Sequence, residues 1–151
     1  MKKVLTLCVI HTADQILLGM KKKGFGAGRW NGFGGKVEAG ETIEAAARRE
    51  TFEEVGLVAE QLEEFGVLEF SFQQNDEILE VHVFRVLAYH GQPRESDEMA
   101  PRWFALNEIP FDEMWADDRH WLPLLLAGKK FRGSFRFDHN DEIIETTMEE
   151  E

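Results

Sequence analysis

Hydrophobic and polar residues follow one another in short patterned runs that predict β-strands. Leu68, Phe70 and Phe72 alternate with polar residues, so that stretch should present one strongly apolar face. A later run, which contains His82, suggests a strand buried on much of both faces, so we interpret His82 as a core or hydrogen-bonded residue. The expected strands span residues 4–10, 16–20, 62–72, 78–89, 102–106, 131–137 and 142–147.

Two stretches predict helices instead. Residues 41–55 contain three consecutive alanines and carry Glu41 and Glu44 in their first turn, where acidic side chains complement the helix dipole. Gly56 follows and matches the glycine that commonly stops a helix. A shorter apolar run, 121–126, predicts a second helix near the end of the chain.

The strands and helices form one series without an internal repeat or a linker. This predicts a single α/β domain over residues 1–151, with 148–151 expected to be frayed and solvated. Cys8 is the only cysteine, which excludes a disulfide framework and favours the cytoplasm. We interpret it as a small buried strand residue. The chain has no apolar run of about eighteen residues, so we expect no membrane partner.

Charge narrows the range of partners further. The formal net charge is −12, from 29 acidic and 17 basic residues. A nucleic-acid polymer is therefore an unsuitable partner, because binding one requires a basic surface. A small phosphorylated ligand remains compatible if a metal ion bridges the two negative partners. We expect such a small-molecule partner and a monomeric protein.

Residues 24–36 hold six glycines in thirteen positions, which predicts an irregular loop. Neither common phosphate-binding motif fits this loop. The dinucleotide fingerprint would require glycine where Asn31 stands, and the P-loop would require other residues at Trp30 and Val37.

Glu50, Glu53 and Glu54 stand at positions i, i+3 and i+4 of the predicted helix, so they share one face. Three carboxylates there repel one another unless a hard divalent cation neutralises them. Taken alone, the pattern is more typical of a solvated acidic face than of a metal site.

The spacing of the surrounding residues distinguishes these two interpretations. The stretch 35–57 resembles the Nudix box, in which Gly, Glu, Arg-Glu, Glu-Glu and Gly recur at fixed intervals. The matching residues are Gly35, Glu41, Arg49, Glu50, Glu53, Glu54 and Gly56. Thr51 departs from the pattern, because an aliphatic residue is usual there, and we expect a local packing loss with intact metal binding.

Resemblance to the Nudix family implies an α/β/α sandwich around a central mixed β-sheet, and metal-assisted pyrophosphate hydrolysis. It implies Mg²⁺ as the cation, with Mn²⁺ as an alternative. Glu54 or Glu98 would deprotonate or orient water, and Arg49 would orient Glu53. The implied ligands are Gly34, Gly35, Glu50, Glu53, Glu54 and Glu98.

The remaining segments resemble the branch of this family that converts oxidised purine nucleoside triphosphates, such as 8-oxo-dGTP and 2-oxo-dATP, to monophosphate and pyrophosphate. Purine stacking on Trp115 and pairing with two aspartates that exchange a proton are implied. Leu79 and Ala116 depart from the familiar residues, which affects the preference among modified purines. The implied substrate contacts are Thr6, Lys21, Phe25, Asn31, Lys36, Phe70, Phe72, Leu79, Trp115, Asp117, Asp118, Trp121 and Phe137.

Three alternatives remain at this stage. Asp117 has the simpler interpretation of an N-cap for the second helix. The substrate is alternatively another nucleoside diphosphate derivative or a methylated purine triphosphate. A catalytically silent nucleotide-binding module is the third alternative, although the chain keeps all of the box glutamates.

Overall fold

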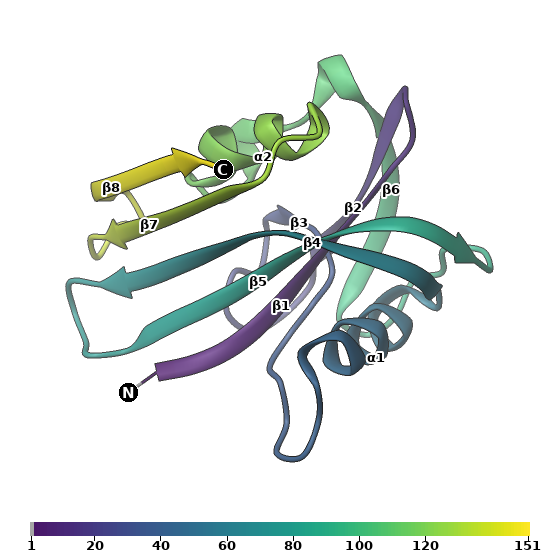
Figure 1. The fold of residues 1–151 in the computed structure, drawn as a ribbon, viewed down its shortest axis with the longest axis horizontal. Helices are drawn as coiled ribbons and strands as arrows, with labels where there is room; N and C mark the ends of the chain where they lie inside the picture. Colours follow the sequence, from purple (N-terminus) through teal and green to yellow (C-terminus); the bar gives the residue numbers. More distant parts are fainter. Residues whose placement is uncertain (1) are drawn as a thin grey trace.

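The computed structural model describes residues 2–151, and eight strands in this range form one mixed sheet (Figure 1). The order along the sheet is β3-β2-β1-β5-β4-β7-β8, and β6 pairs with β2. The pairs β1–β5 and β4–β7 are parallel, whereas the other pairs are antiparallel. The strands are β1 Lys2–His11, β2 Gln15–Lys21, β3 Trp30–Asn31, β4 Val58–Phe72, β5 Ile78–His90, β6 Met99–Ala105, β7 Phe131–Phe137 and β8 Ile143–Glu150.

Helix α1, Ile43–Val55, and helix α2, Asp118–Leu126, cover opposite faces of this sheet (Figure 1). Alternation along β1 explains the two layers, because Val9 packs into the core under α2 and Cys8 into the core under α1. Two short 3₁₀ helices, Leu106–Glu108 and Phe111–Glu113, lead into α2. The predicted α/β/α sandwich with a mixed sheet is confirmed. Within residues 2–151, no helix has the length and apolarity needed to cross a bilayer.

Helix α1 begins later than the sequence pattern predicts. Thr42 is its N-cap, and its hydroxyl accepts a hydrogen bond from the Ala45 N–H at 3.1 Å. Glu41 therefore lies before the helix, and its carboxylate accepts from the Glu38 N–H at 3.0 Å instead. The predicted stop is confirmed, because Gly56 adopts a left-handed φ of 74° and donates its N–H to Phe52 O at 2.8 Å.

The C-terminal residues are ordered by strand pairing, which differs from the predicted frayed tail. Met148 pairs with Gly133, and β8 continues to Glu150. The Glu151 N–H then donates to Lys130 O at 2.9 Å. The acidic composition suggested solvation, but an edge strand can point charged side chains to water while its backbone pairs with a neighbour.

Two residues with polar side chains, Thr51 and Cys8, are buried on the α1 side of the sheet. Thr51 is fully buried, and its hydroxyl donates to Ala47 O at 2.8 Å, so its departure from the box leaves no unpaired donor. Cys8 is also fully buried, as predicted, and burial raises the pKa of its thiol to about 11. Both side chains therefore belong to the packing beneath the helix.

Candidate active site

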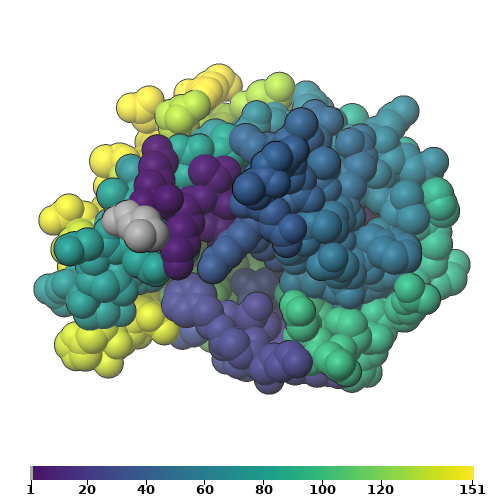
Figure 2. Space-filling view, turned by 90° about the horizontal axis from the view of Figure 1, so that it is seen from below, coloured from purple at the N-terminus to yellow at the C-terminus, as the bar shows by residue number. Residues whose placement is uncertain are grey.

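One cavity of about 180 Å³ gathers the glycine loop, α1, the sheet and the segment before α2. Figure 2 shows a hollow that opens between purple and blue segments early in the chain and a green segment later in it. Most of the predicted site residues meet here. The lining comprises Leu5, Thr6, Leu7, Lys21, Phe25, Asn31, Gly32, Gly34, Gly35, Glu54, Phe70, Phe72, Leu79, Val81, Met99, Trp115, Asp117, Asp118 and Phe137.

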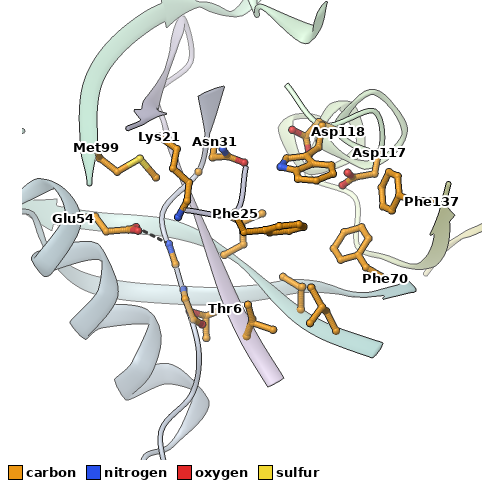
Figure 3. Close-up of a pocket in the computed structure, with 18 of the residues that line it drawn as sticks. Thr6, Lys21, Phe25, Asn31, Glu54, Phe70, Met99, Asp117, Asp118 and Phe137 are labelled. Carbon is orange, nitrogen blue, oxygen red and sulfur yellow. Dashed lines mark hydrogen bonds between the residues drawn. The ribbon is translucent and has the colours of Figure 1, made fainter. Parts of the chain in front are cut away.

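The cavity has two chemically different ends. Figure 3 shows Glu54 and Lys21 at one end, beside α1, and Asp117, Asp118 and Phe137 at the other. Charged groups that suit phosphate chemistry are thus separated from buried hydrogen-bonding groups that suit a flat heterocycle. This separation matches the predicted division between the helix and the base pocket.

Glu54 is the most buried of the box glutamates, with 3% of its surface exposed. Gly34 N–H donates to its Oε1 at 2.9 Å, while burial raises the pKa of the carboxyl to about 8. Burial also raises the pKa of Glu50. Gly34 needs its lack of a side chain, because a Cβ there would lie 1.8 Å from the backbone oxygen of Thr6, and a Cβ on Gly35 would lie 2.6 Å from the Glu50 carboxyl carbon. The glycine pair and these carboxylates therefore form one tightly packed unit.

Arg49 connects this unit to the loop before α1. Its Nε donates to Glu41 at 2.7 Å, and its Nη1 donates to Glu50 at 2.8 Å. The contact with Glu53, predicted to be the important one, is longer at 3.4 Å. Arg49 thus orients Glu50 more directly than Glu53, because the loop places Glu41 on its other side. The same guanidinium lowers the pKa of Glu41 to about 2.

The predicted metal-binding carboxylates do not converge on one point. Across residues 2–151, no three His, Cys, Asp or Glu side chains converge closely enough to hold an ion as they stand. Glu53 is 57% exposed and turned toward Arg49, and Glu98 lies in an exposed part of the loop before β6.

The donor chemistry nevertheless fits a hard cation. Glu50 and Glu54 are close enough to Glu98 for its charge to raise the pKa of both, although burial contributes more. Carboxylate and carbonyl oxygens are the groups that Mg²⁺ binds. Of the two predicted glycine ligands, Gly35 already uses its carbonyl to accept the Thr6 N–H at 2.9 Å. This backbone bond places the glycine pair against β1.

Asp117 and Asp118 are buried at the other end, with 4% and 7% exposure. Burial raises the pKa of Asp117, and burial followed by the Asp117 charge raises that of Asp118 well above its usual range. Asp118 is therefore the member of the pair that holds a proton more readily. Asp117 occupies the N-cap position of α2, as the simpler interpretation predicted, but its side chain makes no capping hydrogen bond and accepts one from Trp121 instead.

Trp121 does not line the cavity, although it was predicted to contact the substrate. It is a buried residue of α2, and its Nε1 donates to Asp117 Oδ2 at 2.8 Å. The helical spacing of four residues brings the indole beneath the carboxylate. Trp121 therefore positions Asp117 through this hydrogen bond and does not line the cavity.

Aromatic rings form the walls near the aspartates. The Phe25 and Trp115 ring centroids lie 5.1 Å apart, and Phe137 contacts Trp115 edge to face at 5.6 Å. Phe25 is 64% exposed at the edge of the cavity. Asn31 enters from β3, where its Nδ2 donates to Arg29 O at 3.2 Å. These rings therefore form a flat apolar slot with polar groups at its inner end.

A second predicted contact, Lys36, was misplaced, and several residues that line the cavity were missed. Lys36 is exposed outside the cavity lining, and its carbonyl accepts from Arg49 at 3.1 Å. Leu5 and Val81, which were not predicted, line the cavity from paired positions on β1 and β5. The alternation of apolar residues along each strand could have indicated that Leu5 and Val81 face inward. Only the strand register shows that the two residues are neighbours. Met99, at the start of β6, had no such signal.

Similarity to known proteins matches this geometry. The NUDIX domain matches residues 1–125. The chain belongs to the Nudix family. It is 53% identical over 148 residues to the oxidized purine nucleoside triphosphate hydrolase of Danio rerio, and 49% identical to that of Mus musculus. Each alignment covers 98% of this chain and 95% of the relative.

Solved structures show the same fold. A mutator MutT protein from Bacillus halodurans superimposes with a TM-score of 0.87 at 24% identity, over 97% of each chain. A MutT NUDIX hydrolase from Burkholderia pseudomallei has a TM-score of 0.68 at 34% identity, over 73% of this chain and 88% of its own. Nudix hydrolases generally use divalent cations, which agrees with the carboxylates on α1.

Proposed function

We propose that this Nudix protein is a diphosphatase for oxidised purine nucleoside triphosphates of the 8-oxo-dGTP and 2-oxo-dATP class. It releases the monophosphate and pyrophosphate and so removes damaged precursors from the nucleotide pool. The observation that carries the proposal is one cavity with the box carboxylate Glu54 at one end and the buried pair Asp117–Asp118 at the other. The names of the two vertebrate relatives support the same substrate class.

At the phosphate end, Glu50, Glu53, Glu54 and Glu98 would hold Mg²⁺, with Mn²⁺ as a substitute. When bound, the cation neutralises phosphate charge and assists attack by water. Glu54 is the candidate to accept a proton from water or to orient it, because it lines the cavity and its carboxylate is held by the Gly34 N–H at 2.9 Å. Lys21 lines the same end and supplies positive charge toward phosphate.

At the base end, the purine ring stacks on Trp115 and lies against Phe72 and neighbouring rings. Its polar edge pairs with Asp117 and Asp118, since a buried unpaired donor or acceptor costs about 1–3 kcal/mol. A protonated Asp118 donates and an ionised Asp117 accepts, so the pair can match more than one arrangement of donors and acceptors. This property suits two differently oxidised purines.

The proposed partner is a free nucleotide, and the proposed state is a monomer in the cytoplasm. The net charge of −12 supports this partner, because a nucleic-acid polymer would be repelled. The single cysteine, which is buried and reduced, suits a reducing compartment. Gel filtration coupled to light scattering measures the oligomeric state directly.

A substrate panel with pyrophosphate detection tests the function. We expect the highest kcat/KM for 8-oxo-dGTP or 2-oxo-dATP, with dGTP and dATP at least about tenfold lower, because each unmatched buried polar group weakens binding. A methylated purine triphosphate and ADP-ribose complete the panel. Chelation of divalent cations should abolish turnover, and added Mg²⁺ should restore it. Preference for ADP-ribose, or turnover in EDTA, would refute the proposal.

A further inference from the structure

Arg29 lies against Trp115 without lining the cavity. Its guanidinium carbon sits 4.2 Å from the centre of the Trp115 ring, which is a cation–π contact. Within residues 2–151, the cavity lining includes Trp115 but not Arg29. The guanidinium therefore packs on the indole from outside the cavity lining, whereas the Phe25 ring packs on it from within the lining, with centroids 5.1 Å apart and a tilt of 34°.

Asp141 holds the guanidinium in place from the distant β7–β8 turn. Arg29 Nη2 donates to Asp141 Oδ2 at 3.0 Å, and the two side chains are each 31% exposed. Asp141 is the one non-glycine residue in residues 2–151 with a positive φ, at 61°. Its N–H donates to Asp138 O at 3.1 Å. The turn thus presents the carboxylate from a defined backbone position.

The turn itself is closed by a second carboxylate. Asp138 Oδ1 accepts the backbone N–H groups of Asn140 and Glu142 at 2.8 and 3.0 Å. These two bonds lower the pKa of Asp138. Asp141 lies between the two donors, so its placement follows from the turn rather than from Arg29.

Trp115 needs such support because its own segment is irregular. It follows the short helix Phe111–Glu113 and precedes α2, so no regular element sets the direction of its ring. Gly26 touches its edge, where a Cβ would come within 3.1 Å of the indole nitrogen. Side-chain packing therefore decides the plane of the ring.

We propose that Arg29 is a positioning residue for base recognition, which fixes the plane of the Trp115 ring while Asp141 anchors the guanidinium. The inference rests on the proposed function for the identity of the base. It assigns the β7–β8 turn, which has no contact with the cavity, a role in purine binding. The planar guanidinium is suited to this, because it stacks on an aromatic face while its edge pairs with a carboxylate.

The first test is a binding cycle with 8-oxo-dGMP as the probe. Arg29→Met should raise the Kd about three- to tenfold, the range of a desolvated cation–π contact, and should leave kcat with 8-oxo-dGTP within about twofold. Arg29→Lys should fall between, since it keeps charge but loses the planar stack. In a Trp115→Ala background, Arg29→Met should have no further effect. An undiminished effect there would overturn the proposal.

Arg119→Met is the matched control, because Arg119 lies over the ring of Phe111 and pairs with Asp112 without contacting Trp115. Its Kd should equal that of wild type. Asp141→Asn should reproduce part of the Arg29→Met effect, and an unchanged Kd in both variants would refute the inference. Thermal melting verifies that each variant is folded.

A ligand-free measurement separates this inference from the proposed function. The near-ultraviolet circular dichroism of wild type minus Trp115→Ala reports the fixed Trp115 ring. That difference band should weaken in the Arg29→Met background, and an identical band would overturn the positioning role. Failure of wild type to bind 8-oxo-dGMP would instead refute the proposed function, and the band would still decide the role of Arg29.

Discussion

At the scale of single residues, burial separates groups that look alike in the sequence. Glu53 and Glu54 are neighbours in the box, yet Glu53 has 57% of its side chain exposed and Glu54 is almost fully buried. A buried carboxyl resists ionisation, whereas an exposed one does not. Asp117 and Asp118 are both buried, and they differ because Asp118 also meets the charge of Asp117. Function at this scale depends on solvent access more than on residue type.

Glu54→Gln should lower kcat by about 10²–10⁴-fold, because it removes the buried proton acceptor and proposed metal ligand. The amide oxygen can still accept the Gly34 N–H, so the fold should persist. Added Mg²⁺ should raise the melting temperature of wild type but have little effect on the variant. Glu44→Gln, on the exposed part of α1, is the control. Near-normal turnover by Glu54→Gln would contradict the assigned role.

Asp117→Asn and Asp118→Asn should change the ratio of kcat/KM for 8-oxo-dGTP to that for 2-oxo-dATP, by about tenfold or more in at least one variant. An amide cannot exchange roles as a carboxyl does, so one of the two bases is left with an unpaired buried group. Competition assays with both substrates measure the ratio. Identical ratios in wild type and both variants would rule out the pair as the determinant.

At the scale of elements, the capping residues of α1 decide which glutamates belong to the helix. Thr42 begins it and Gly56 ends it, so Glu50 and Glu54 lie one turn apart on the face toward the glycine loop. Arg49 then ties the helix back to Glu41 in the preceding loop. The phosphate end of the cavity is therefore a helix–loop unit, whose geometry depends on where the helix starts.

Thr42→Ala should destabilise the protein by about 1 kcal/mol, because the Ala45 N–H loses its acceptor. A domain of this size should then melt roughly 2–4 °C lower. Thr42→Ser keeps the hydroxyl and should melt close to wild type. Equal melting temperatures for the alanine and serine variants would show that the cap contributes nothing. Calorimetry on the three proteins makes the comparison.

At the scale of the whole molecule, contacts of one histidine with two carboxylates on neighbouring strands link folding stability to pH. His82 on β5 contacts Glu64 of β4 at 2.5 Å and Glu80 of its own strand at 2.7 Å, as a hydrogen-bonded histidine was predicted to do. Burial alone would lower the pKa of His82, but the two carboxylates outweigh it and raise the pKa. Because the folded protein binds this proton more tightly, folding is stabilised while His82 is charged.

The contribution of His82 to the free energy of unfolding should be fully present below its unfolded pKa of about 6.5. It should be lost as the pH rises through the pKa that His82 has in the folded protein. Wild type should therefore lose stability relative to His82→Gln as the pH rises above about 6.5. Urea unfolding at several pH values measures the difference. His139→Gln, in the exposed β7–β8 turn, is the control and should follow wild type. A constant gap between wild type and His82→Gln would contradict the linkage.

The sequence by itself determined the elements, the family and the phosphate chemistry. Local patterns suffice for these, because strand alternation, helix spacing and the box depend on residues close in the chain. Segments that resemble known relatives also predicted most of the residues that line the cavity.

Only the tertiary structure decided the positions that depend on contacts between distant segments. It placed Trp121 behind Asp117 instead of in the cavity, excluded Lys36, and ordered the acidic tail as strand β8. It also brought Asp141 to Arg29, 112 positions earlier, which no local pattern could reveal. Such outcomes depend on strand register and on which face of an element is covered, and these are set by the packing of the whole sheet.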